Sequence, residues 1–144
     1  MSPNELEKRI GHEIRSRGFD DDSYIDRNEQ REIIQIAIEL GGTLEGAMTA
    51  LSNVCSEKSY VLESRLLKQI EDEITRVVGS GGSVDQRGFD HIFDNVKRAV
   101  QGKKTDREVK RLIVQVLEDS GRNKIKTGWF SNWYANLKHE LDMS

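Results

Sequence analysis

The chain has 144 residues, of which 35% are hydrophobic and 33% charged, and its formal net charge is −3. Its single cysteine, Cys55, excludes a disulfide framework within the chain, and we expect this residue to be a small core residue of a helical segment. The sequence contains no run of 18 apolar residues and no basic region followed by an apolar stretch, so we expect a soluble, cytoplasmic protein that does not span a membrane.

Apolar residues with helical spacing begin close to the N-terminus. Ser2-Pro3-Asn4-Glu5 combines a capping serine, a proline at the first helical position and a capping-box glutamate. Leu6, Ile10 and Ile14 then recur every four residues, and Gly18 provides a C-terminal stop. This pattern predicts a first helix that buries one stripe of apolar side chains in the core.

Two more helices are predicted after an acidic connection over residues 19–25. Asp26 caps the first, with Glu29 three residues on, and Thr43 caps the second after the Gly41-Gly42 break. We expect the apolar residues of both helices to face the core, namely Ile33, Ile34, Ala37, Ile38, Leu40, Leu44, Ala47, Met48, Leu51 and Val54.

A long helix is predicted from about residue 60 to residue 78, and a glycine-rich segment follows it. Gly79-Ser80-Gly81-Gly82 indicates a flexible hinge between two halves, at about 1–79 and 82–144. Beyond the hinge, Asp85 and Thr105 each cap a further helix, and the tail from Ser131 onward is predicted to form a short closing helix.

The two halves share one pattern: an apolar residue, an aspartate cap, a helix, a glycine-containing break, a threonine cap and a second helix. Asp26 and Thr43 carry it in the first half, and Asp85 and Thr105 in the second, with a small insertion. Extended structure is expected only at residues 23–25 and 82–84. We therefore predict an all-α fold of six to seven helices, built as two related helix-loop-helix halves around one core.

The acidic connection resembles the calcium loop of an EF-hand when Ile25 is placed at the hydrophobic eighth position. The candidate metal ligands are then Asp20, Asp22, Asp26 and Glu29. Gly18 stands where an aspartate is expected and Ser23 where a glycine is expected. The second loop, 77–88, keeps Val84-Asp85 but lacks the carboxylates at positions one, three, five and twelve, so we do not expect it to bind calcium. The alternative interpretation is a capping box that follows a solvated acidic turn.

A second resemblance covers about residues 18 to 120. Two acidic or glycine-rich loops, each opening a helix at Ile25-Asp26 or Val84-Asp85, resemble the helical modules of the tellurite-resistance TerB-like group. The resemblance implies an all-helical fold and acidic loops linked to metal and stress systems. The sequence lacks the Ala-Asp-Gly that usually opens those loops.

Positive charge is concentrated between Lys97 and Lys126, a segment that contains ten Lys or Arg residues and only four Asp or Glu residues. This segment predicts contact with an acidic protein surface, and phosphate contacts with a nucleic acid are an alternative. The whole protein is acidic, with a pI of about 5.7, which argues against nucleic-acid binding. The candidate contact residues are Lys103, Lys104, Arg107, Lys110 and Arg111.

The C-terminal segment holds both tryptophans, Trp129 and Trp133, with Phe130 and Tyr134 beside them. The closing helix folds back onto the core in one interpretation. In the other, Trp129 and Trp133 are exposed anchors for a partner, since tryptophan and tyrosine contribute strongly to interfaces.

Catalytic motifs are absent from the sequence. His12, His91 and His139 are far apart, and none has metal-ligand spacing with another histidine or with the cysteine. We therefore predict a non-catalytic protein-interaction or regulatory module without a cofactor. A calcium-responsive protein is the first alternative, and nucleic-acid binding through residues 97–126 is the second.

Overall fold

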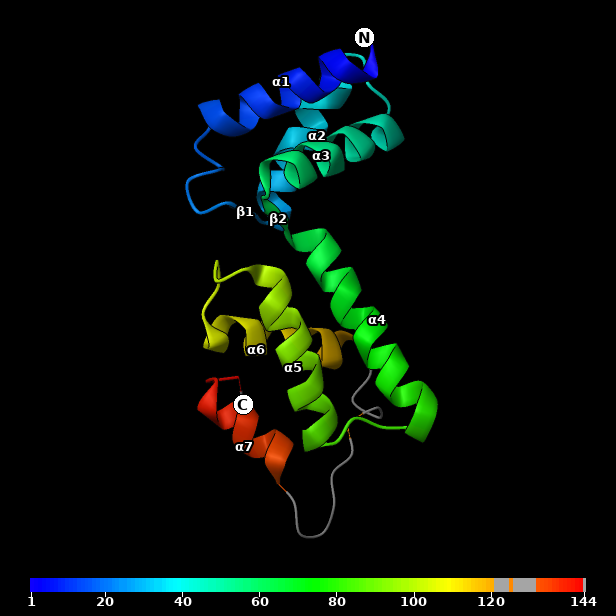
Figure 1. Ribbon diagram of the computed structural model, residues 1–144, viewed down its shortest axis with the longest axis vertical. Coiled ribbons are helices and arrows are strands. Elements are labelled where there is room, and N and C mark those ends of the chain that lie inside the picture. Colours follow the sequence, from blue (N-terminus) through cyan, green and yellow to red (C-terminus); the bar gives the residue numbers. More distant parts are fainter. Residues whose placement is uncertain (121–124, 126–131, 144) are drawn as a thin grey trace. The chain divides into compact units, whose positions relative to one another are not determined.

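The computed structural model describes residues 1–120, 125 and 132–143, and this part of the chain contains seven α-helices and one two-stranded sheet. The elements are α1 (Pro3–Ser16), β1 (Tyr24–Ile25), α2 (Arg27–Glu39), α3 (Leu44–Lys58), β2 (Val61–Leu62), α4 (Glu63–Gly81), α5 (Gln86–Val100), α6 (Asp106–Ser120) and α7 (Trp133–Glu140) (Figure 1). The predicted all-α fold class is confirmed. None of these helices has the length and apolarity that a membrane crossing requires.

The chain divides into two compact units, which we call unit 1 (Met1–Ser64) and unit 2 (Arg65–Ser144). In unit 1, α1, α2 and α3 pack around a core of their own (Figure 1). That core contains Leu6, Ile10, Ile14, Ile25, Ile33, Ile34, Ala37, Ala47, Ala50, Leu51, Val54, Cys55 and Leu62. Cys55 is fully buried, as expected.

A short parallel pairing joins the two ends of unit 1. Tyr24 pairs with Val61, and Ile25 with Leu62. The hydroxyl of Tyr24 donates to Glu63 Oε2 at 2.6 Å, which ties the first residue of α4 to β1. The extended residues 24–25 were expected from the sequence, whereas their partner strand lies where a continuous helix was predicted.

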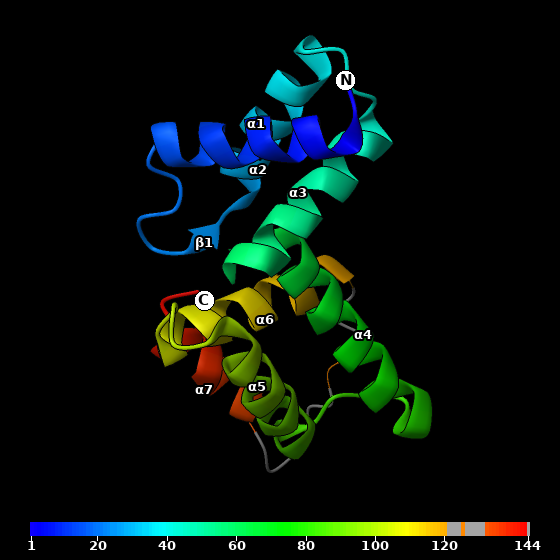
Figure 2. The same cartoon turned by 45° about the horizontal axis from the view of Figure 1, so that its top comes forward.

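In unit 2, α5, α6 and α7 lie against one another (Figure 2). Val84, two residues before the start of α5, forms a parallel bridge with Ile125. Buried apolar residues of the unit include Leu66, Ile70, Ile74, Val84, Phe89, Ile92, Val96, Val100, Val109, Ile113, Leu117, Trp133, Leu137 and Leu141. The Val84–Ile125 bridge occupies the place in unit 2 that the Ile25–Leu62 pairing occupies in unit 1, which supports an internal duplication.

Capping side chains start the helices where the sequence predicts them. The side chains of Ser2, Asp26, Thr43, Asp85 and Thr105 each accept a hydrogen bond from the backbone amide three residues on, at 2.8 to 3.2 Å. Each cap satisfies one of the amides that a helix start leaves without a partner.

The division between the units does not fall at the predicted glycine-rich hinge. α4 continues through Gly79 and ends at Gly81, and the units meet at Ser64 and Arg65, in the first turn of α4. A glycine weakens a helix interior by about 1 kcal/mol relative to alanine, which the apolar face of a long helix offsets. Gly82, whose φ is +85°, follows the end of the helix.

Three apolar side chains that were expected in the core lie on the surface of unit 1. Ile38 is 45% exposed, Leu44 58% and Met48 49%. Their neighbours Ala37, Ala47 and Leu51 are buried as predicted. The apolar face of the α2–α3 hairpin is therefore wider than the area that the core covers.

Candidate functional site

The acidic connection between α1 and β1 is held by hydrogen bonds within unit 1. Asp22 Oδ1 accepts from the Tyr24 amide at 3.1 Å, and Asp20 Oδ2 accepts from the Tyr60 hydroxyl at 3.4 Å. Burial, and then the carboxylate of Asp20, raise the pKa of the Tyr60 hydroxyl above its ordinary value. Ser23 adopts the left-handed backbone, with φ of +55°. Both aspartates thus stabilise the turn.

The other two candidate ligands form the predicted capping box. Asp26 Oδ1 accepts from the Glu29 amide at 2.8 Å, and Glu29 Oε1 accepts from the Asp26 amide at 3.0 Å. Burial raises the pKa of the Glu29 carboxyl above its ordinary value; the Asp26 amide opposes this shift, and the negative charges of Asp26, Asp22 and Asp21 add to it.

These side chains do not gather into a cation cage. Within the described ranges, no three His, Cys, Asp or Glu side chains lie close enough together to hold a metal ion. The four candidate ligands, Asp20, Asp22, Asp26 and Glu29, instead belong to two separate local hydrogen-bond arrangements. Calcium requires six to eight oxygen ligands around one point, so this arrangement does not fit the ion.

The turn between α5 and α6 carries the first of the candidate basic residues. Lys103 Nζ donates to Gln101 Oε1 at 3.2 Å, and Lys104 Nζ lies 3.5 Å from Glu108 Oε2. The Thr105 amide, and then the Thr105 hydroxyl and Lys104, lower the pKa of the Glu108 carboxyl, while burial opposes them. Both lysines therefore have acceptors within their own turn.

Two arginines of α6 hold the C-terminal end of α7. Arg107 donates to the Glu140 carbonyl and pairs with the Asp142 carboxylate, each at 2.8 Å. Arg111 donates to the Leu141 carbonyl at 2.8 Å. Carbonyls at a helix end lack helical partners and carry partial negative charge, so the two guanidinium groups stabilise the docked α7.

Aromatic contacts engage two more lysines. The ammonium of Lys110 lies 5.2 Å from the ring centre of Phe93, and that of Lys97 lies 5.8 Å from the same centre. Lys97 also pairs with Asp106 at 3.3 Å. All five candidate basic residues of the sequence thus have partners within the chain, so another molecule would have to compete with these contacts.

Trp133 is part of the packing of unit 2. It is only 9% exposed, and its ring lies 5.9 Å from that of Phe89 and 5.5 Å from that of Tyr134, measured between centroids. This position fits the closing-helix interpretation and not an exposed anchor. Trp129 and Phe130 lie outside the described residues.

The surface of the α2–α3 hairpin was missed as a candidate site by reasoning from sequence. Ile38, Leu44 and Met48, which we call the hairpin patch, lie within about one helical turn of the connection between α2 and α3. Leu44 and Met48 are four residues apart and share one face of α3. The signal in the sequence is an apolar stripe on α3 that is wider than one core face requires.

Histidine contacts do not form a catalytic arrangement in the described part of the chain. His12 Nε2 lies 3.2 Å from Ser16 Oγ, but both groups are exposed and neighbour each other on one helix. His91 contacts the Asn95 amide at 3.4 Å. No carboxylate among the described residues contacts His12 to orient its ring, so the serine lacks the third member of a catalytic triad.

No family model, no curated protein and no solved structure matches the chain.

Proposed function

We propose that this protein is a non-catalytic protein-interaction module that binds a partner through the hairpin patch. The observation that carries the proposal is the exposure of three large apolar side chains, at 45%, 58% and 49%, at one end of the α2–α3 hairpin. Single exposed apolar residues are common on soluble proteins, whereas a group at one place favours an interaction site.

The rim of the hairpin patch indicates the chemistry of its partner. Glu39 follows Ile38 and Glu45 follows Leu44, and both glutamates are exposed. Interfaces combine a desolvated apolar centre with a polar rim, and complementary rim charges speed association. The hairpin patch therefore favours a partner protein with an apolar anchor bordered by Lys or Arg.

The basic segment supports an acidic partner less strongly than its sequence suggests. Lys104, Arg107 and Arg111 already bind acceptors within the chain, so a partner would have to replace those contacts. Nucleic-acid binding through residues 97–126 depends on the same side chains and is weakened by the same contacts.

Calcium binding is the remaining alternative, through Asp20, Asp22, Asp26 and Glu29. It requires the acidic connection to rearrange, because these carboxylates now accept hydrogen bonds from the chain itself. A calorimetric titration with calcium tests it: heat that is lost in Asp22→Ala would favour this alternative over the interaction module.

The interaction module is tested by comparing two variants of α3 in affinity purification from cells that express the protein. Leu44→Gln with Met48→Gln removes most of the hairpin patch and keeps good helix formers. Thr49→Gln, at an exposed position of the same helix, is the control. We expect at least one protein to bind the wild type and Thr49→Gln but to be lost from the double variant.

Circular dichroism and thermal melting establish that both variants fold. Surface substitutions of this kind change stability by about 0.5 kcal/mol or less. If every protein retained by the wild type is retained equally by the folded double variant, the hairpin patch does not bind the partner and the proposal fails.

A further inference from the structure

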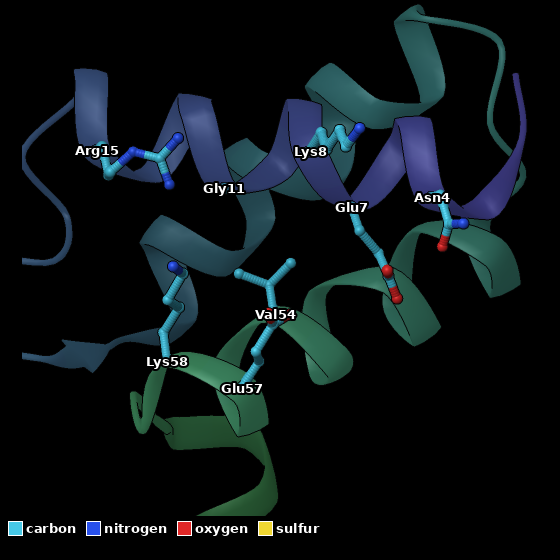
Figure 3. Close-up of a pocket in the computed structure, with 8 residues that line it drawn as sticks. All are labelled: Asn4, Glu7, Lys8, Gly11, Arg15, Val54, Glu57 and Lys58. Atoms are coloured by element: carbon cyan, nitrogen blue, oxygen red, sulfur yellow. The ribbon is translucent and has the colours of Figure 1, made fainter.

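A charged groove runs between α1 and α3 on unit 1, separate from the hairpin patch. It has a volume of about 470 Å³. Its lining residues are Asn4, Glu7, Lys8, Gly11 and Arg15 from α1 and Val54, Glu57 and Lys58 from α3 (Figure 3). The α1 residues follow one face of the helix, next to the face that is buried in the core.

Three cations, Lys8, Arg15 and Lys58, line this groove together with two carboxylates, Glu7 and Glu57. Lys8, Arg15 and Lys58 make no ion pair and no side-chain hydrogen bond with any residue that the structure describes. By contrast, Arg17 pairs with Glu13 at 3.2 Å on the same helix. Arg15 and Lys58 lie at the same end of the groove (Figure 3).

Gly11 forms part of the groove wall beneath the Arg15 side chain. A Cβ at this position would lie 3.3 Å from Arg15 Nη1, and no other neighbouring atom would lie within 4 Å of it. Close packing of α1 against α3 therefore does not require glycine here. The Arg15 guanidinium occupies the space that a side chain at position 11 would fill. Glycine disfavours a helix interior, but at this position it leaves room for the Arg15 side chain to lie along the groove.

The side-chain donors at this end of the groove favour an anion. Arg15 and Lys58 lie in the last turns of α1 and α3, whose C-terminal ends each carry about half a negative charge. Two full positive charges exceed these two partial charges by about one unit. Lys8 adds one positive charge, and Glu7 and Glu57 subtract two, so the charges around the groove nearly cancel. What favours an anion is therefore the set of side-chain donors on Arg15 and Lys58, whereas Glu7 Oε1 already accepts from Asn53 Nδ2 at 2.8 Å.

We propose that the α1–α3 groove binds the phosphate group of a phosphorylated ligand, with the Arg15 guanidinium as the main donor and Lys58 and Lys8 as flanking charges. A guanidinium presents paired N–H donors that match the oxygens of a phosphate. A phosphate monoester carries about 1.5 to 2 negative charges at neutral pH, so it gains more from three nearby cations than a single carboxylate does. The proposal does not depend on the hairpin patch.

The test is a titration of the ¹⁵N-labelled full chain with inorganic phosphate, followed by NMR at constant ionic strength with sodium chloride as the balancing salt. The Gly11 amide is the reporter, since it lies beneath Arg15. We expect a saturable shift with a dissociation constant on the order of 1 mM. A parallel titration with acetate should bind at least about fivefold more weakly, because acetate offers one charge.

Three variants with matched changes of charge identify the site. Arg15→Gln should weaken phosphate binding at least about fivefold, and Glu57→Gln should tighten it about twofold, since each alters one charge next to the anion. Arg31→Gln, an exposed position of α2 outside the groove, should leave the affinity unchanged. Amide spectra of all three verify that unit 1 remains folded.

The proposal is overturned if the Gly11 shift does not saturate with phosphate, or if sodium chloride alone reproduces it. It is equally overturned if Arg15→Gln and Arg31→Gln bind phosphate with the affinity of the wild type, because the binding would then lie elsewhere. Equal affinity for acetate and phosphate overturns the assignment of a phosphate ligand.

Discussion

Two glutamates in equivalent capping boxes experience opposite electrostatic environments. Glu29 is partly buried beside three aspartates, which raises its pKa, whereas the Thr105 amide and hydroxyl and Lys104 lower that of Glu108. A raised pKa means that the folded state holds the proton more tightly, so the contribution of Glu29 to stability is present below pH 4.5 and is lost as the pH rises through its folded pKa. The contribution of Glu108 to stability is present above pH 4.5 and is lost as the pH falls through the lowered pKa of Glu108 in the folded state.

We therefore predict opposite pH dependence for Glu29→Gln and Glu108→Gln. Relative to the wild type, Glu29→Gln should become more stable as the pH rises from 4 to 7, because glutamine carries no charge to desolvate. Glu108→Gln should lose more stability at pH 7 than at pH 4, because it removes a favourable charge. Urea unfolding at both pH values measures this. Parallel curves for the two variants would contradict the assigned environments.

At the scale of elements, helix starts follow from short-range chemistry and are visible in the sequence. Asp26 and Thr105 were recognised as caps because a capping side chain acts on an amide only three residues away. β2 was missed because Leu62 continues the helical spacing of Leu66 and Ile70, and its pairing with Ile25 depends on residues far apart in the chain. The sequence thus predicts where elements begin better than how they pair.

The same distinction applies to the candidate site. The roles of Arg107 and Arg111 depend on the position of α7, some 30 residues away, so their spacing alone suggested a free basic surface. The exposure of Met48 depends on how much of α3 the core covers, which the apolar pattern does not specify. The helix caps could therefore be predicted from the sequence. Whether a side chain is free to bind another molecule depends on the tertiary structure and could not be predicted.

The docking of α7 should depend on the arginines of α6. Arg111→Gln removes a partly buried charged donor to the Leu141 carbonyl, and we expect a loss of about 1 to 2 kcal/mol. Hydrogen exchange of the α7 amides should accelerate about 5- to 30-fold, because one turn of α6 no longer holds the end of α7. Arg98→Gln, at an exposed position of α5, removes the same charge and is the control. Unchanged exchange in Arg111→Gln would show that apolar packing of Trp133 and Leu137 suffices to dock the helix.

For the whole molecule, the repeated arrangement gives a physical reason for two units. Each unit has a helix, an extended residue, an aspartate-capped helix, a threonine-capped helix and a second extended residue that pairs with the first in parallel. The extended pair closes the chain of each unit onto itself, which fits the division of the chain into two compact units. Units of this kind open as separate cooperative segments if their internal contacts outweigh those between them.

Matched core substitutions test whether the units unfold separately. Ile14, in α1, and Ile92, in α5, are both fully buried, and replacing either by valine costs about 0.5 to 1.5 kcal/mol. If the units open independently, Ile14→Val accelerates hydrogen exchange about 2- to 12-fold for the slowest amides of unit 1 and leaves those of unit 2 unchanged, with Ile92→Val giving the reverse. Because each variant serves as the control for the other, an equal acceleration in both units would mean that α4, which begins in one unit and continues in the other, couples them into one cooperative domain.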